Sequence, residues 1–138
     1  MSLLLERLSR GHIDLAPSFR APSKNWDEAT QSRFIESALL GIPLPAIYAA
    51  DAGDTDWAVL DGAQRITALA QFIKPELLDT EPLRLRGLEF LPYEGQTHND
   101  LRDPLRRRLE QTHITVHILR PGAPDGVLAS LARRLHGH

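Results

Sequence analysis

One run of the sequence, residues 57–73, constrains the fold most strongly, because a strand pattern passes directly into a helix pattern. Trp57-Ala-Val-Leu60 predicts a strand, and Asp61-Gly62 breaks it. Four apolar side chains then recur at i, i+3, i+4 and i+7, which predicts a helix with one buried face: Ile66, Leu69, Ala70 and Ile73. The chain has 138 residues, a length that fits one domain. We therefore expect a small domain that combines helices with strands.

Other parts of the chain repeat both kinds of pattern. Asp27 predicts the N-cap of a helix that Gly41 and Pro43 end. Residues 13–25 predict an extended segment because they hold two prolines. In residues 112–119, alternation predicts a strand with Ile114, Val116 and Ile118 on one face. The remaining predicted elements are strand 47–49, paired with 57–60 as a hairpin, strand–turn–strand 83–91, helix 101–109 and helix 125–136.

Composition excludes several classes of protein. Sixteen Lys and Arg residues against 18 Asp and Glu give a net charge of −2, which argues against a basic protein that coats nucleic acid. With no cysteine, the chain has no disulfide, no thiolate nucleophile and no cysteine-ligated metal, and the reducing cytoplasm is the simplest expected location. No run of about 18 apolar residues predicts a membrane span, and the N-terminus does not resemble a secretory signal.

The strand–turn–helix junction at residues 61–67 is the strongest candidate for a binding site. Gly62 lets the backbone approach a ligand, and the free N–H groups of the following helix attract anions. Arg65 can bind a phosphate with two N–H groups, and Thr67 can donate a hydroxyl. Asp61 can hold a metal ion or a water that Gln64 orients. An ordinary Asp-Gly turn is the alternative interpretation.

The same residues resemble a known family, the N-terminal domain of GmrSD-type modification-dependent restriction enzymes. The resemblance rests on several blocks in the family's order: Trp26, Ser32–Pro45, Asp61–Leu69 with Phe72, Leu85-Arg-Gly-Leu88, Gly95 with Leu101, and Thr115–Leu119. It covers residues 13–136 and implies a branch of the ParB/sulfiredoxin-type fold. That fold is a compact α+β domain with a small mixed sheet and helices packed around it. We expect one such domain over residues 1–138, truncated at its C-terminal side.

The resemblance also implies a function, namely binding and hydrolysis of a nucleoside triphosphate to control cleavage of modified foreign DNA. Asp61, Gln64 and Arg65 would be catalytic, with Mg²⁺ held by Asp61. The phosphate-binding positions would be Gly62, Ala63, Arg65, Thr67 and Arg20. Because Ala63 stands where the family signature has glutamine, a non-catalytic interaction module remains the alternative. Sulfiredoxin chemistry itself needs a cysteine and is excluded.

The expected partners are a nucleotide and a separate nuclease or DNA-recognition subunit. For helix 125–136 we expect either self-association or marginal stability, because its leucine stripe has no following helix to cover it: Leu128, Leu131 and Leu135. Tight binding to DNA is not expected of this chain alone, since acidic residues interrupt the basic cluster Arg102–Arg108. His113 and His117 lie too far apart on a strand to share one metal ion.

Overall fold

The computed structural model describes residues 1–17, 25–51, 53, 56–119, 126, 127, 130, 133 and 134. The chain divides into two compact units. The helical unit comprises Met1–Leu5, Asn25–Leu44 and Gln64–His113. The sheet unit comprises Glu6–Lys24, Pro45–Ala63 and Ile114–His138.

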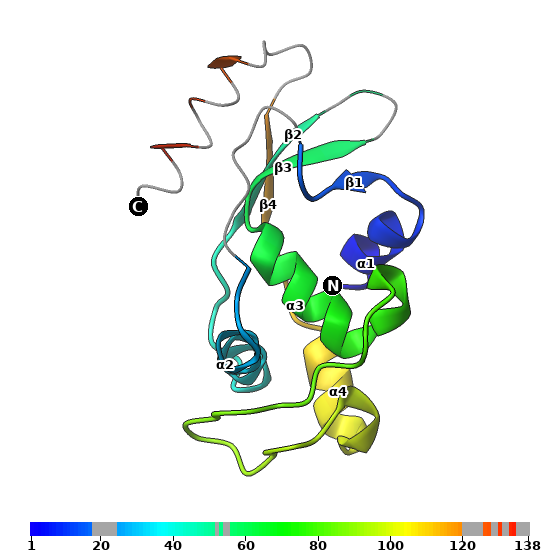
Figure 1. Ribbon diagram of the computed structural model, residues 1–138, viewed down its shortest axis with the longest axis vertical. Coiled ribbons are helices and arrows are strands. Elements are labelled where there is room, and N and C mark those ends of the chain that lie inside the picture. The colour runs from blue at the N-terminus through cyan, green and yellow to red at the C-terminus, as the bar shows by residue number, and fades with distance from the viewer. Residues whose placement is uncertain are drawn as a thin grey trace. The chain divides into compact units, whose positions relative to one another are not determined.

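Helices and strands alternate along the described residues, as Figure 1 shows. In chain order the elements are α1 (Ser2–Ser9), β1 (Ile13–Asp14), α2 (Glu28–Leu39), β2 (Ile47–Asp51), β3 (Trp57–Asp61), α3 (Ala63–Ile73), the 3₁₀ helices η1 (Pro75–Leu78) and η2 (His98–Asp100), α4 (Asp103–Glu110) and β4 (Val116–Leu119). The predicted α+β class is confirmed, because the described residues form four α-helices and one mixed sheet. None of the described helices has the length and apolar character needed to cross a membrane.

The sheet unit has the strand order β1-β3-β2-β4 (Figure 1). β2 and β3 pair antiparallel and form the predicted hairpin, with a shift of register between Tyr48 and Ala49. β1 runs parallel to β3, and β4 runs parallel to β2. Ile47, Val59 and Leu60 are buried in this unit. Burial of apolar side chains from β2 and β3 fixes the register of these two strands, and the candidate site begins where β3 ends.

In the helical unit, α2 begins where the sequence predicts. The Asp27 carboxylate accepts a hydrogen bond of 2.8 Å from the Thr30 N–H, which is the N-cap arrangement. Ile35 and Leu39 on α2 are fully buried, as are Leu69 and Phe72 on α3, so each helix packs one apolar face into the core. These two helices carry most of the residues that the sequence analysis singled out.

The prediction of strand–turn–strand at residues 83–91 is wrong, because the described chain there is an irregular loop. Leu83 and Leu85 are buried, so the alternating pattern correctly indicates that these two apolar side chains face the core. Leu83 and Leu85 donate to the backbone carbonyl groups of Gln71 and Gln96, but the N–H groups from Arg86 onward that have described acceptors donate to side chains. The Arg86 N–H donates to Ser32 Oγ at 2.9 Å, and the next turn of the loop is held in the same way by Glu36. Side-chain acceptors on α2 replace the ladder that the pattern predicted.

The strand predicted over residues 112–119 is shorter than expected. β4 covers only Val116–Leu119, and Ile118 on this strand is 42% exposed. β4 lies at the end of the strand order, where one side of the strand has no neighbouring strand among the described residues.

Two features of the N-terminal half and one of the C-terminal region complete the comparison with the sequence. Helix α1 was not predicted, although Leu4 and Leu5 are buried. Arg20 lies outside the described residues, and so do Leu128, Leu131 and Leu135 of the predicted helix 125–136. The five residues described in that segment have helical backbone.

Candidate functional site

The candidate site lies where β3 passes into α3. β3 ends at Asp61, Gly62 forms the turn, and α3 begins at Ala63, so the predicted strand–turn–helix junction is confirmed. The boundary between the two units falls inside this run, after Ala63.

Gly62 has a structural role of its own. Its φ is +108°, a conformation that L side chains rarely adopt. A Cβ at this position would lie 2.9 Å from Cγ1 of Ile47, which is buried in the sheet unit. Glycine is therefore required here for both backbone conformation and packing, whether or not a ligand approaches.

Asp61 and Ala63 flank this glycine in the sheet unit and differ in exposure. Asp61 is half-buried and lies opposite Tyr48 in the register of β2 and β3. The side chain of Ala63 is buried, so the methyl group that replaces the family's glutamine packs into the interior. Its backbone N–H belongs to the first turn of α3.

Gln64 opens the part of α3 that belongs to the helical unit, and both polar atoms of its side chain are engaged. Its Oε1 accepts a hydrogen bond of 3.1 Å from the Trp26 N–H, and its Nε2 donates to Asn25 Oδ1 at 3.3 Å. The side chain thus holds the segment that leads into α2. The predicted role of Gln64 in orienting a water stays a prediction, but the structure adds a positioning role that the sequence did not reveal.

Arg65 and Thr67 follow on α3, and both side chains are half-buried. The first turn of α3 contains no acidic residue. The helix dipole gives that turn a partial positive charge, and Arg65 adds a full positive charge to it. This combination is chemically suited to an anion such as phosphate.

The residue with the most specific polar environment was missed as a key residue in the sequence analysis. Glu36 on α2 is only 3% exposed, and its carboxylate accepts three backbone hydrogen bonds. The Glu89 N–H donates to Oε1 at 3.0 Å, and the N–H groups of Phe90 and Leu91 donate to Oε2 at 2.9 and 2.8 Å. Burial acts to raise the pKa of Glu36, but these three N–H groups and the nearby charge of Arg33 together lower the pKa below its ordinary value.

This buried carboxylate fixes a loop whose tip is exposed. Phe90 is 73% exposed, although its N–H is bound to Glu36. The sequence gives a faint signal for the arrangement, because Glu36 follows directly on the buried Ile35 in the apolar stripe of α2. Nothing in the spacing shows that its partners are backbone groups more than 50 residues later.

His98 on η2 was also missed in the sequence analysis. It contacts Phe72 edge to face, with the ring centroids 5.6 Å apart, and its Nε2 lies 3.5 Å from a Glu110 oxygen. Burial lowers the pKa of His98, and the charge of Arg106 lowers it further, whereas the charge of Glu110 raises it. At neutral pH the neutral ring is favoured, which suits packing against Phe72.

The described residues offer little to hold a metal ion without a ligand's help. They contain no group of three or more His, Cys, Asp or Glu side chains that could surround a cation. His117 stacks against Tyr48 with ring centroids 5.0 Å apart, and His113 is exposed.

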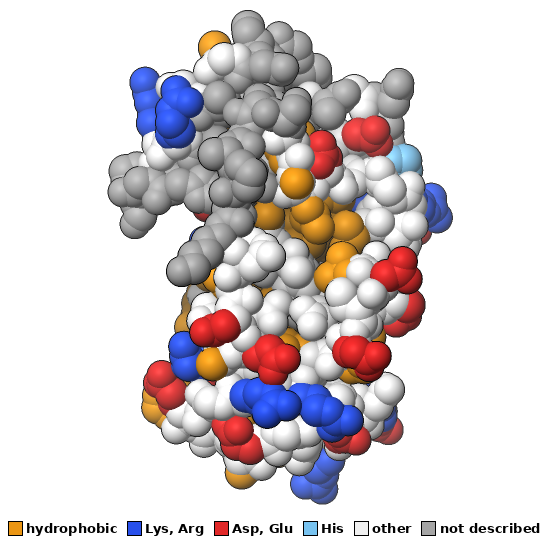
Figure 2. Space-filling model, viewed as in Figure 1, with side chains coloured by type: hydrophobic (Ala, Val, Ile, Leu, Met, Phe, Trp, Pro, Cys, Tyr) orange, Lys and Arg blue, Asp and Glu red, His pale blue; other side chains and the backbone are white. Residues whose placement is uncertain are grey.

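The basic cluster Arg102–Arg108 does not form a uniformly positive surface. Arg106 is paired with Asp103, and Arg108 donates to the backbone carbonyl of Leu39 at 3.4 Å. Figure 2 shows basic and acidic side chains interspersed over the face that it draws. This mixture is typical of a solvated protein surface.

Comparison with known proteins adds one family. The family described as GmrSD restriction endonuclease, N-terminal domain, has a model that matches residues 7–120. This range includes residues 61–67, Glu36 and the loop at residues 89–91 that Glu36 holds. No curated protein and no solved structure matches the chain.

Proposed function

The chain belongs to the GmrSD restriction endonuclease N-terminal domain family, and we infer that it serves there as a nucleoside-triphosphate-binding regulatory domain. Restriction endonucleases defend against phage, so the domain is part of a defence system. The observation that carries it is the junction at residues 61–67, where a strand ends in a carboxylate and the next helix begins with an arginine in its first turn.

Phosphate chemistry matches the charges in this run. The N-terminus of α3 has a partial positive charge from the helix dipole, and its first turn has no acidic side chain. Arg65 can add two charge-assisted hydrogen bonds, each stabilising by about 1.5–3 kcal/mol. Thr67 supplies a hydroxyl on the second turn of the same helix. A triphosphate would use these groups together.

Magnesium fits the proposal in a limited way. Proteins commonly hold Mg²⁺ with one or two carboxylates together with phosphate oxygens, so a single carboxylate can suffice when a nucleotide is bound. The half-buried Asp61 would provide that carboxylate. The ion would neutralise phosphate charge, while Arg65 and the amides of α3 orient the phosphates.

A non-catalytic interaction module is the second candidate, and two observations favour it. Both polar atoms of the Gln64 side chain are bound to the segment Asn25–Trp26, so in this conformation they hold protein structure. The buried Ala63 side chain also replaces a polar residue of the family signature. A domain of this kind would keep the fold and contribute contacts to the nuclease, with no turnover.

Titration calorimetry with ATP and GTP, each with and without Mg²⁺, separates the two candidates. We expect binding that strengthens with Mg²⁺, and Arg65→Ala should weaken it at least about tenfold. The matched control is Arg107→Ala, which removes an exposed arginine from α4 and should leave binding unchanged. Absence of binding at millimolar nucleotide would exclude the nucleotide-binding function and favour the interaction module. Unfolding of Arg65→Ala would show a structural role for that residue.

A further inference from the structure

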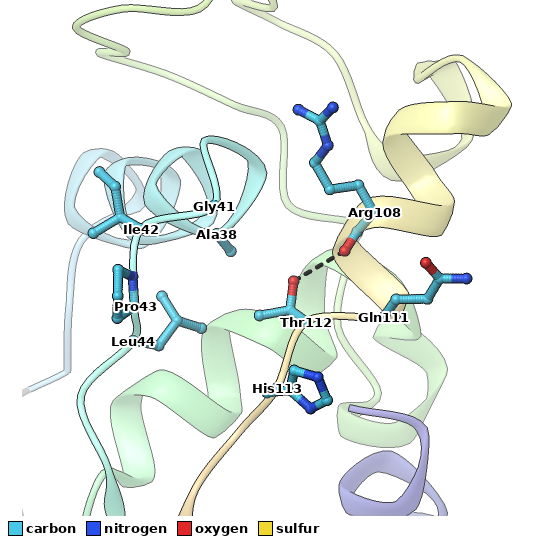
Figure 3. A pocket seen from close by; sticks show the side chains of 9 residues that line it. All are labelled: Ala38, Gly41, Ile42, Pro43, Leu44, Arg108, Gln111, Thr112 and His113. Carbon is cyan, nitrogen blue, oxygen red and sulfur yellow. Dashed lines mark hydrogen bonds between the residues drawn. The ribbon is translucent and has the colours of Figure 1, made fainter.

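The helical unit contains a pocket of about 310 Å³ that lies away from the junction in sequence. It is formed by the end of α2 with the following loop 41–44 on one side, and by the end of α4 with residues 111–113 on the other (Figure 3). Small-molecule sites occupy roughly 300–1,000 Å³, so the pocket has room for a small ligand. Its two walls differ in chemistry.

The first wall is apolar. Ile42, Pro43 and Leu44 line it, and Ile42 is 48% exposed. The Ile42 N–H donates to the Ser37 carbonyl at 3.0 Å, and Gly41 makes the turn out of α2 at a φ of +77°. Pro43 also fixes its own φ, which limits the backbone conformations of this loop.

The second wall is polar and carries a positive charge. Figure 3 shows Arg108, Gln111 and His113 across the pocket from loop 41–44, and Thr112 Oγ1 donates to the Arg108 carbonyl at 3.0 Å. Within the described residues Arg108 forms no ion pair with a carboxylate, whereas Arg106 on the same helix is paired with Asp103. Its hydrogen bond to the Leu39 carbonyl uses one of five guanidinium N–H groups.

We propose that this pocket binds a small amphipathic anion, with an apolar ring on Ile42, Pro43 and Leu44 and one phosphate or carboxylate group on Arg108. The ring covers apolar surface that is otherwise exposed to water. The anion supplies Arg108 with the negative partner that the described residues do not provide. The proposal is independent of nucleotide binding at residues 61–67, because no residue of that run lines the pocket.

A purely structural role for Arg108 makes a different prediction. A cation beside the last carbonyl groups of α2 stabilises that helix through its dipole. If this is the whole role, Arg108→Gln lowers the free energy of unfolding and no ligand binds. If the pocket is a site, binding depends on both the charge and the apolar wall.

The test is a two-dimensional ¹H–¹⁵N NMR titration of the whole chain with phenyl phosphate, and separately with inorganic phosphate. Phenyl phosphate should shift the amides of loop 41–44 and residues 111–113 in a saturable way. Inorganic phosphate lacks the ring and should bind at least about tenfold more weakly. Adenosine monophosphate is a third probe. If adenosine monophosphate binds more tightly than phenyl phosphate, the pocket is assigned to nucleotides. If it binds more weakly, the pocket is assigned to smaller aromatic anions. In both cases the ligand has an apolar ring and one anionic group.

Variants show whether the named residues bind the probe. Arg108→Gln and Ile42→Asp should each weaken phenyl phosphate binding at least about tenfold. Arg107→Gln, one residue away on α4, should leave it unchanged. Ile42 is exposed, so Ile42→Asp remains informative if Arg108→Gln does not fold. Equal affinity for the two phosphates, no saturable shifts at about 10 mM phenyl phosphate, or unchanged affinity of the Ile42→Asp variant would each overturn the proposal.

Discussion

Replacing the buried carboxylate of Glu36 should destabilise the loop at residues 89–91, whose backbone N–H groups donate to that carboxylate. In Glu36→Gln, an amide oxygen at the place of Oε2 still accepts from Phe90 and Leu91, but the amide nitrogen at the place of Oε1 faces the Glu89 N–H. The unpaired donors destabilise by about 1–3 kcal/mol, and the loss of charge from the two remaining bonds removes about 1 kcal/mol. We expect the free energy of unfolding to fall by about 2–4 kcal/mol at pH 7.

The effect of Glu36 should also depend on pH in a defined direction. Its pKa in the folded protein is lower than its ordinary value of 4.5, so its contribution to stability is complete above that value and is lost as the pH falls below it. The difference in unfolding free energy between the wild type and Glu36→Gln should therefore shrink as the pH falls below 4.5.

Urea unfolding at several pH values measures this difference, and hydrogen exchange at the amides of residues 89–91 reports on the loop itself. The matched control is Glu89→Gln, which removes an exposed carboxylate from the same loop. The reasoning fails if Glu36→Gln loses less than about 1 kcal/mol at pH 7, if the control loses as much, or if the gap does not narrow in acid.

The remaining predictions address the junction and the basic cluster. Gly62→Ala should lower the free energy of unfolding by about 2–4 kcal/mol, whereas Gly11→Ala should lower it by only about 1 kcal/mol. Both glycines have a positive φ, but only a Cβ at residue 62 would meet another side chain. Equal losses in thermal or urea unfolding would contradict this. Gln64→Ala should destabilise by about 1–2 kcal/mol and speed hydrogen exchange at the Trp26 amide, and an unchanged exchange rate would refute the positioning role. The cluster Arg102–Arg108 should bind duplex DNA no more tightly than about 10⁻⁴ to 10⁻⁵ M at physiological salt, and sub-micromolar affinity in a mobility-shift titration would disprove it.

Elements with strong local signals were predictable from the sequence. Asp27 predicts the start of α2 because an N-cap accepts hydrogen bonds from N–H groups only a few residues away. The helical spacing of Ile66, Leu69 and Ala70 predicts α3 from equally local information. The hairpin of β2 and β3 also follows from two apolar runs around a polar turn. In each of these elements the interacting residues lie close in sequence, so the local sequence pattern is enough to predict the helix or the hairpin.

Residues 83–91 show why the same approach fails elsewhere. Alternation there correctly identifies Leu83 and Leu85 as buried, but it cannot show which acceptor each backbone N–H will meet. The acceptors are Ser32 and Glu36, more than 50 residues earlier in the chain. A glutamate on an amphipathic helix is usually exposed, and only the path of a distant loop reveals that this one is buried.

The residues that mark the junction in the sequence prove to have structural partners, and this changes how variants there must be interpreted. Gly62 is fixed by the approach of Ile47, and Gln64 is bound to Trp26, with no ligand needed to explain either residue. Loss of nucleotide binding in a variant at either position would therefore follow from a displaced α3 as readily as from a lost ligand contact. The two causes separate only when affinity and the free energy of unfolding are measured on the same variant. A site residue in this junction is one whose replacement lowers affinity by a factor larger than its destabilisation can explain, and Arg65 is the first position at which to apply that criterion.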